Sequence, residues 1–242
     1  HLRATKVREE GPNATGIVEA EVLEGGKVWD RKGINLPDST LSVETITEAD
    51  LEVLDGLLES VDMVALSFVR SASDIEQLKK EMKARGRVVP VIAKIERQEP
   101  LAELEAITQA ADAVMVARGD LGVEIGYDKV PQVEARINAL GNRYGKPTMV
   151  ATEVLLSMAK GETRPSRADV HALNDAICHQ GADMIMLGKE TSFPDNPERV
   201  VQAAAKIIRQ AEHDLWQAKT SEPSGGSLLS VLVQQHKASK GD

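Results

Sequence analysis

The sequence predicts an α/β fold in which five parallel strands alternate with helices and form part of a (β/α) barrel. Five short apolar runs have the length of buried strands, and the segments between them carry apolar residues at helical spacing. Regular alternation of strands and helices is typical of a parallel sheet with right-handed crossovers. Polar side chains follow all five runs, as they do at the active-site rim of a barrel.

The predicted strands are residues 62–68, 88–93, 114–117, 148–151 and 184–187. Neither G-x-G-x-x-G nor G-x-x-x-x-G-K-[ST] follows any of them, which counts against an open nucleotide-binding sheet. A complete eight-stranded barrel needs three more strands than we find. The sequence therefore favours part of a barrel.

Capping patterns and helical spacing predict the helices. Three pairs fit the capping-box pattern, namely Thr47 with Asp50, Ser73 with Glu76, and Ser166 with Asp169. Further helices are predicted with Pro100 in a first turn, at residues 129–143, and from Asn196-Pro197 onward.

Three domains are predicted along the chain. Residues 1–40 read as the end of a small β domain, because residues 18–22 alternate apolar and acidic side chains. Gly25-Gly26 would then form a turn, and residues 27–29 would begin the returning strand of a hairpin. Residues 41–217 are the barrel portion with the active-site rim, and residues 218–242 are a linker and a short tail.

The composition excludes several classes of function. A net charge of −9 and only six aromatic residues argue against nucleic acid or an anionic membrane as partner. No apolar run is long enough to cross a bilayer, and no signal peptide opens the sequence. The single cysteine, Cys178, suits a reducing cytoplasm. The chain begins with His1, and we expect it to be a fragment or a processed piece.

Charged residues follow two neighbouring predicted strands and define a candidate site. The run 88–93 leads into Lys94 and Glu96, and the run 114–117 leads into Asp120. Adjacent parallel strands would place these side chains on one rim, where two carboxylates suit Mg²⁺ and a lysine suits a phosphate or an enolate. Two surface carboxylates and a rim lysine fit the same spacing equally well, so the residues alone leave both interpretations open.

Six motifs, in sequence order, resemble those of the pyruvate kinase family. They are RKGINLP (31–37), DMVALSFVR (62–70), AKIE (93–96), VMVARGDLGVEI (114–125), GKPTMVAT (145–152) and RPSRA (164–168). The resemblance implies a (β/α)8 (TIM) barrel with a small β domain inserted after its third strand. The five strands would then be the fourth to the eighth. Residues 218–242 are too few for the family's regulatory domain, so effector control is not expected.

The resemblance also implies an activity and its cofactors. The family transfers the phosphoryl group of phosphoenolpyruvate to ADP, which gives pyruvate and ATP in glycolysis. Glu96 and Asp120 match the ligands of Mg²⁺ or Mn²⁺. Lys94 matches the lysine that stabilises the transferring phosphoryl group and the enolate, so it is both catalytic and substrate-binding.

The remaining matches concern substrate binding. Thr152 matches the catalytic threonine near the carbon that gains a proton, and Ser67 matches the serine near the substrate phosphate. Gly119 and Asp120 match the backbone N–H groups that receive the substrate carboxylate.

Several positions depart from the family pattern. Glu153 replaces the usual glutamine, Leu156 replaces a customary glutamate, and Gly188-Lys189-Glu190-Thr191 stands for S-G-E-T. The family has an arginine that binds the phosphate, and a monovalent-cation site. This sequence contains no match for that arginine or for most of the residues of that site. Nucleotide binding and a K⁺ requirement are therefore left open.

Two other readings remain. One is a metal-dependent lyase of the wider phosphoenolpyruvate/pyruvate barrel group, which would ignore ADP. The other is a non-catalytic barrel piece. A homo-oligomer or completion by a second polypeptide is expected, because an open five-stranded sheet leaves apolar edges exposed.

Overall fold

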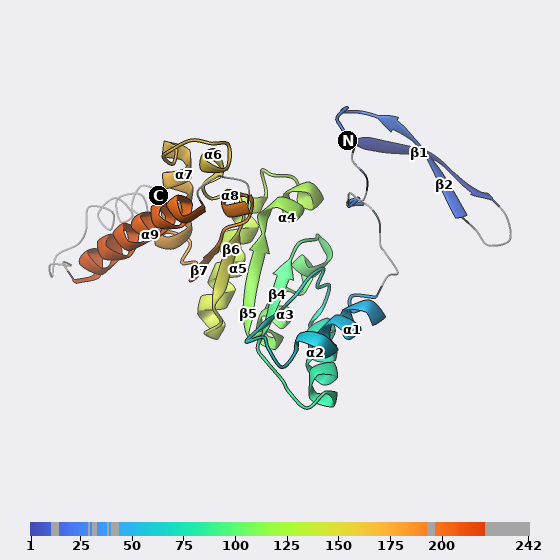
Figure 1. The fold of residues 1–242 in the computed structure, drawn as a ribbon, viewed down its shortest axis with the longest axis horizontal. Coiled ribbons are helices and arrows are strands. Elements are labelled where there is room, and N and C mark those ends of the chain that lie inside the picture. Colours follow the sequence, from blue (N-terminus) through green and yellow to red (C-terminus); the bar gives the residue numbers. More distant parts are fainter. Residues whose placement is uncertain are drawn as a thin grey trace, which may run out of the picture. The chain divides into compact units, whose positions relative to one another are not determined.

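The computed structural model describes residues 1–10, 15–28, 30, 33–37, 39, 44–192 and 197–220. The chain divides into two compact units, His1–Asn35 and Leu36–Asp242 (Figure 1). The predicted domain limits at residues 40 and 217 stay predictions, and residues 221–242 of the predicted tail lie outside the described residues.

The first unit is an antiparallel hairpin of β1 (Leu2–Glu10) and β2 (Thr15–Val22). β2 contains the predicted strand at 18–22, but its partner is β1. The predicted returning strand is wrong at Lys27 and Val28, which belong to no strand, and Trp29 lies outside the described residues. The sequence between β1 and β2 contains Gly11-Pro12-Asn13, a turn signal that competes with Gly25-Gly26.

The second unit contains the predicted five-stranded parallel sheet, which confirms the α/β class. Its strands are β3 (Val64–Leu66), β4 (Val91–Ile95), β5 (Ala113–Ala117), β6 (Thr148–Ala151) and β7 (Met184–Met186). They pair in chain order, so β3 and β7 are the edges of the sheet among the described residues.

Helices connect these strands (Figure 1). They are α1 (Glu48–Leu57), α2 (Ala72–Ala84), α3 (Leu104–Ala110), α4 (Arg118–Ile125), α5 (Val130–Tyr144), α6 (Leu156–Ala159), α7 (Arg167–Cys178), α8 (Lys189–Ser192) and α9 (Pro197–Thr220). Among the helices that the structure describes, none combines the length and the apolar character that a bilayer crossing requires.

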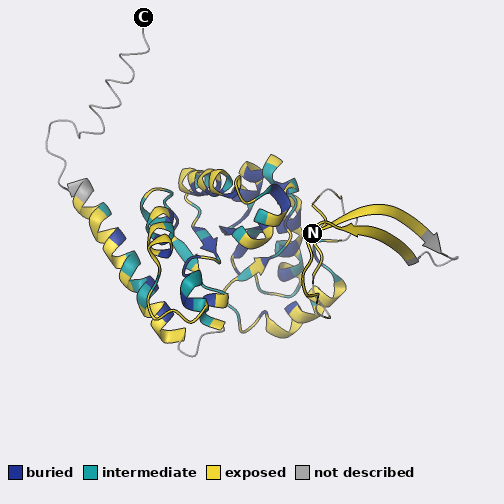
Figure 2. Cartoon of the chain, turned by 90° about the horizontal axis from the view of Figure 1, so that it is seen from above, coloured by how far each residue is buried: buried dark blue, intermediate teal, exposed yellow. Residues whose placement is uncertain are grey.

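The sheet separates two groups of buried side chains. All five residues of β5 are buried, as expected for a central strand. Figure 2 shows that the buried residues gather in the second unit, whereas the hairpin of the first unit is exposed. Val114 and Val116 pack with the larger core, which includes residues of α2, α3 and α5. Ala113 and Met115 pack with Ile92 on the opposite face. This division follows from the alternation of side chains along a strand.

Two of the three predicted capping boxes are confirmed, at Thr47 with Asp50 and at Ser166 with Asp169. The third is wrong by two residues. α2 begins after Ser71, and the Asp74 carboxylate accepts hydrogen bonds from the N–H groups of Arg70 (2.8 Å) and Ser71 (3.0 Å). The pairs 71/74 and 73/76 have the same spacing, and the structure uses the earlier pair, whose aspartate is buried.

Element boundaries also differ from the predictions. β4 begins at Val91 instead of Val88, because Pro90 has no N–H for the ladder. Pro100 lies in a short 3₁₀ helix, Glu99–Ala102, that precedes α3. The segment after β5 that contains Asp120 forms α4, which follows Ala117 directly.

Candidate active site

The candidate site lies at the carboxyl edge of the sheet. In the parallel register, Ile95 of β4 pairs with Val116 of β5, and Ala117 pairs with Ala151 of β6. The residues that follow each strand therefore emerge next to one another. This register brings three sequence-predicted residues into contact and places three others around a pocket.

Ser67, Lys94 and Glu96 form the first group. The Lys94 ammonium nitrogen lies 2.7 Å from Glu96 Oε1 and donates to Ser67 Oγ at 2.9 Å. Lys94 and Glu96 are two positions apart along an extended segment, so their side chains emerge on the same face. Lys94 therefore contacts both Glu96 and Ser67, and the roles assigned to the three residues stay predictions.

The Glu96 carboxylate is almost fully buried, with 2% of the side chain exposed. A buried charge is stable only when it is paired and hydrogen-bonded. Lys94 pairs with one oxygen, and the backbone N–H of Phe68 donates to the other at 2.7 Å. Phe68 has φ +55°, a left-handed conformation that is strained for a non-glycine residue. The strained backbone at Phe68 thus directs an N–H group at Glu96.

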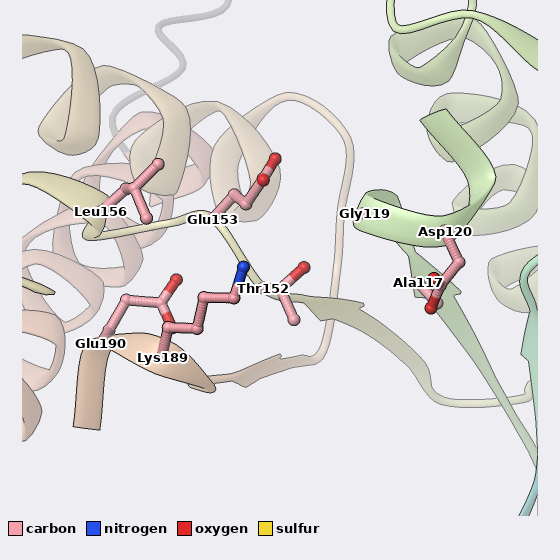
Figure 3. A pocket seen from close by; sticks show the side chains of 8 residues that line it. All are labelled: Ala117, Gly119, Asp120, Thr152, Glu153, Leu156, Lys189 and Glu190. Atoms are coloured by element: carbon pink, nitrogen blue, oxygen red, sulfur yellow. The ribbon is translucent and has the colours of Figure 1, made fainter. Parts of the chain in front are cut away.

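A pocket of about 240 Å³ lies at the carboxyl ends of β5 and β6 (Figure 3). Three predicted site residues line it, namely Gly119, Asp120 and Thr152. Three positions that depart from the family pattern also line it, namely Glu153, Leu156 and Lys189. Ala117 and Glu190 complete the lining. In Figure 3 Asp120 lies on one side, and Thr152, Lys189 and Glu190 lie on the other. Ser67, Lys94 and Glu96 are not part of this lining.

Thr152 has an unusual environment. Its φ is +67°, and its hydroxyl oxygen is buried without a hydrogen-bond partner among the described residues. A Cβ atom added at Gly119 would lie 3.8 Å from Thr152 Oγ1, and one added at Gly188 would lie 3.4 Å from Cγ2. Both distances are ordinary van der Waals separations, so Gly119 and Gly188 lie next to the threonine side chain, but the lack of a Cβ atom there is not what makes room for it.

Glu190 is buried but already bonded. Its Oε2 accepts a hydrogen bond from the Gly188 N–H at 2.7 Å, which closes the turn after β7. Lys189 precedes it and is exposed at the pocket. Glu190 was not among the predicted site residues, and the unusual G-K-E-T sequence was the only available signal.

Arg118 connects the start of α4 to the end of β6 and to α5. Its Nε donates to the Thr152 carbonyl oxygen at 3.1 Å, and Nη2 donates to the same oxygen. Nη1 lies 3.8 Å from Glu134 Oε2 on α5. Burial raises the pKa of the Glu134 carboxyl above its ordinary value, and the charge of Arg118 opposes this shift.

The donor set at the site fits Mg²⁺. No group of three or more His, Cys, Asp and Glu side chains able to hold a metal occurs in the part of the chain that the structure describes. Mg²⁺ does not need one, since it binds one or two protein carboxylates together with waters and substrate oxygens. Glu96 and Asp120 could supply these two carboxylates, and their assignment as ligands stays a prediction.

Comparisons with known proteins agree with this architecture. Residues 4–201 match the family model described as pyruvate kinase, barrel domain. The chain is 45% identical over 198 residues to the pyruvate kinase of Corynebacterium efficiens. The aligned residues are 81% of this chain and 41% of that relative. The chain is 41% identical over 206 residues to the pyruvate kinase of Thermotoga maritima, with coverages of 85% and 44%.

The third relative is pyruvate kinase 2 of a Synechocystis species, 40% identical over 231 residues, with coverages of 94% and 39%. The chain thus spans less than half the length of the curated relatives it matches. The five βα units are part of the barrel domain that the family model describes. The chain belongs to the pyruvate kinase family.

Proposed function

We propose that this chain carries part of a pyruvate kinase active site, and that the full-length protein transfers the phosphoryl group of phosphoenolpyruvate to ADP. The observation that supports this most directly is the contact of Lys94 with both Ser67 and Glu96 at the rim of the sheet. A fixed ammonium group beside a carboxylate and a hydroxyl suits a substrate that carries both a phosphate and a developing enolate.

In the proposed reaction, the bond between phosphorus and the bridging enol oxygen breaks while a bond forms to a terminal oxygen of ADP. The electron pair of the broken bond stays on the enolate oxygen. Lys94 stabilises negative charge on the transferring group and on this oxygen, and Ser67 binds the substrate phosphate. Such interactions accelerate the reaction if they are stronger in the transition state than in the ground state.

The enolate then takes a proton at its methylene carbon and becomes pyruvate. The Thr152 hydroxyl is buried and has no partner among the described residues, which supports a role for it near this carbon. The backbone N–H groups of Gly119 and Asp120 would bind the substrate carboxylate. A divalent ion, Mg²⁺ or Mn²⁺, would be held by Glu96 and Asp120 and would neutralise charge on the enolate and the carboxylate.

The contact of Lys94 with Ser67 supports the kinase over a lyase of the same barrel group, since a lyase has no phosphoryl group to transfer. The proposal includes a cytoplasmic location, and completion of the sheet by further strands of a longer chain, by another copy or by a second polypeptide. β3 and β7 each have one neighbouring strand in the described sheet, so their outer edges are open to pairing.

The metal assignment is tested by Mn²⁺ binding to Glu96→Gln and Asp120→Asn, measured by titration calorimetry or electron paramagnetic resonance. We expect each variant to lose at least about tenfold in affinity, since metal sites are sensitive even to changes around the ligands. Glu103→Gln, at an exposed carboxylate outside the pocket, is the matched control and should bind as the parent does. Parental affinity in both site variants would remove the assignment.

The reaction is tested in the full-length protein by pyruvate formation from phosphoenolpyruvate, ADP and Mg²⁺, with and without K⁺. The same assay without ADP tests the lyase hypothesis. A kinase cannot turn over without ADP as the phosphoryl acceptor, whereas a lyase cleaves a carbon–carbon bond and does not need ADP. Absence of ADP-dependent pyruvate formation in the parent would overturn the proposed function.

A further inference from the structure

The backbone at the end of β6 is strained at two consecutive positions. Thr152 has φ +67° and Glu153 has φ +59°. Positive φ is unfavourable for residues with a Cβ, and most of all for a β-branched residue such as threonine. Such conformations persist only when the surrounding structure holds them in place. Contacts around Thr152 should therefore reveal what maintains it.

Both backbone polar groups of Thr152 are held by neighbouring segments. Its N–H donates to the Met186 carbonyl oxygen of β7 at 3.0 Å. Its carbonyl oxygen accepts two hydrogen bonds from the Arg118 guanidinium, at the start of α4. The planar guanidinium carries donors in a rigid fork, whereas a lysine ammonium is a compact group on a flexible stem. Arg118 therefore constrains the direction of this carbonyl more than a lysine would.

The guanidinium is itself fixed. The Arg118 side chain is 15% exposed, and its Nη1 lies 3.8 Å from the Glu134 carboxylate, which is 4% exposed on α5. Arg118 thus joins α5 to the carboxyl ends of β5 and β6. Its orientation is determined by packing and by a charge that does not belong to the pocket lining.

The constrained residue is part of the pocket lining. Thr152 lines the pocket together with Gly119, and its Oγ1 has no partner among the described residues. We propose that Arg118 is a positioning residue that holds the strained Thr152 backbone and thereby aims the Thr152 hydroxyl at the reacting carbon of the substrate. The inference rests on the proposed function, because it takes proton delivery to the enolate carbon as the task of Thr152.

The test compares Arg118→Lys with Arg136→Lys in the full-length protein. Arg136 is a suitable control, because it lies on α5, is exposed, and also donates to a backbone carbonyl, that of Leu101, at 3.1 Å. Exchange of the pyruvate methyl protons with D₂O, followed by proton NMR, reports proton transfer at carbon alone. The affinity for oxalate with Mn²⁺ reports binding alone, since oxalate is a planar dianion that resembles the enolate.

We expect Arg118→Lys to slow methyl exchange by about 10- to 100-fold, because misplacing a reacting group by about 1 Å costs this much. Its oxalate affinity and its KM for phosphoenolpyruvate should change by less than about threefold, and Arg136→Lys should match the parent in all three. Methyl exchange in Arg118→Lys within about twofold of the parent would overturn the inference. An equal loss of exchange and oxalate binding would also overturn it, because it would indicate a general structural role.

Amide hydrogen exchange at residues 152–154 separates this inference from the proposed function. Faster amide exchange in Arg118→Lys than in Arg136→Lys supports the constraint on Thr152, and equal protection overturns it. If the parent neither exchanges methyl protons nor forms pyruvate, the proposed function fails, and the inference fails with it whatever the amides do.

Discussion

Replacing Lys94 by methionine removes the charge that compensates the buried Glu96 carboxylate. The ammonium lies 2.7 Å from a carboxylate whose side chain is 2% exposed. Breaking a buried ion pair from one side costs about 3–5 kcal/mol, since the other charge is left unpaired. Lys94 is 23% exposed, so water can reach part of the site and we expect about 2–3 kcal/mol. For a chain of this size the loss corresponds to a decrease in Tm of roughly 5–10 °C.

A double-mutant cycle isolates the interaction. Lys94→Met with Glu96→Gln removes both charges, and the amide oxygen can still accept the Phe68 N–H, so the double variant should lose only about 1 kcal/mol. The coupling energy should therefore be about 1.5 kcal/mol or more, as for residues in direct contact. Urea unfolding of the parent, the two single variants and the double variant, in buffer with a chelator, measures it.

Lys79 and Asp112 provide a matched pair for comparison. Their charges lie 2.8 Å apart, but the side chains are 31% and 37% exposed. Exposed pairs couple by only about 0.2–1 kcal/mol. Adding Mg²⁺ should return part of the lost stability to Lys94→Met, since the proposed ion would place positive charge on Glu96. Additive single-variant costs at Lys94 and Glu96, or coupling no larger than in the exposed pair, would refute this reasoning.

Two further predictions concern carboxyl groups whose pKa values shift in opposite directions. Burial raises the pKa of Glu134 above 4.5, so folding stability should fall as pH rises from that value through the raised pKa. Glu134→Gln should flatten this part of a stability–pH profile from urea unfolding, and an unchanged slope would contradict the assignment. Desolvation opposes ionisation of Asp169, but hydrogen bonds from Ser157 and Ser166 prevail and hold its pKa below 3.8. The contribution of the ionised Asp169 to folding stability is complete above pH 3.8 and is lost as pH falls through the lowered pKa. Asp169→Asn should cost about 1 kcal/mol at pH 7 and less near pH 2.

The sheet was predictable from sequence because its signals are local. β5 is a continuous apolar run, and a strand buried on both faces requires one. The hairpin partner was not predictable in the same way, because pairing depends on contacts between segments, and two turn signals flank residues 18–22. The prediction of the α2 cap was wrong for a similar reason, since Ser71 and Ser73 both precede an acidic residue by three positions.

The contact between Lys94 and Glu96 was predictable for a geometric reason. Residues two apart on an extended segment share a face, and the parallel register places Ser67 next to them. The links around Thr152 were not predictable, because they join the ends of β5, β6 and β7 and the side of α5. No local pattern specifies which carbonyl an arginine reaches, or that a threonine adopts a positive φ.

The strained residues have a common relation to the candidate site. Phe68, Thr152 and Glu153 are the non-glycine residues with positive φ in the described ranges, and all follow β3 or β6 at the carboxyl edge of the sheet. Strain at each costs about 1–3 kcal/mol. At Phe68 it directs an N–H to the Glu96 carboxylate, and at Thr152 it accompanies a buried hydroxyl that has no partner among the described residues. Folding energy is thus used to fix a charged group and a hydroxyl before any substrate binds, which is what preorganised electrostatic catalysis requires.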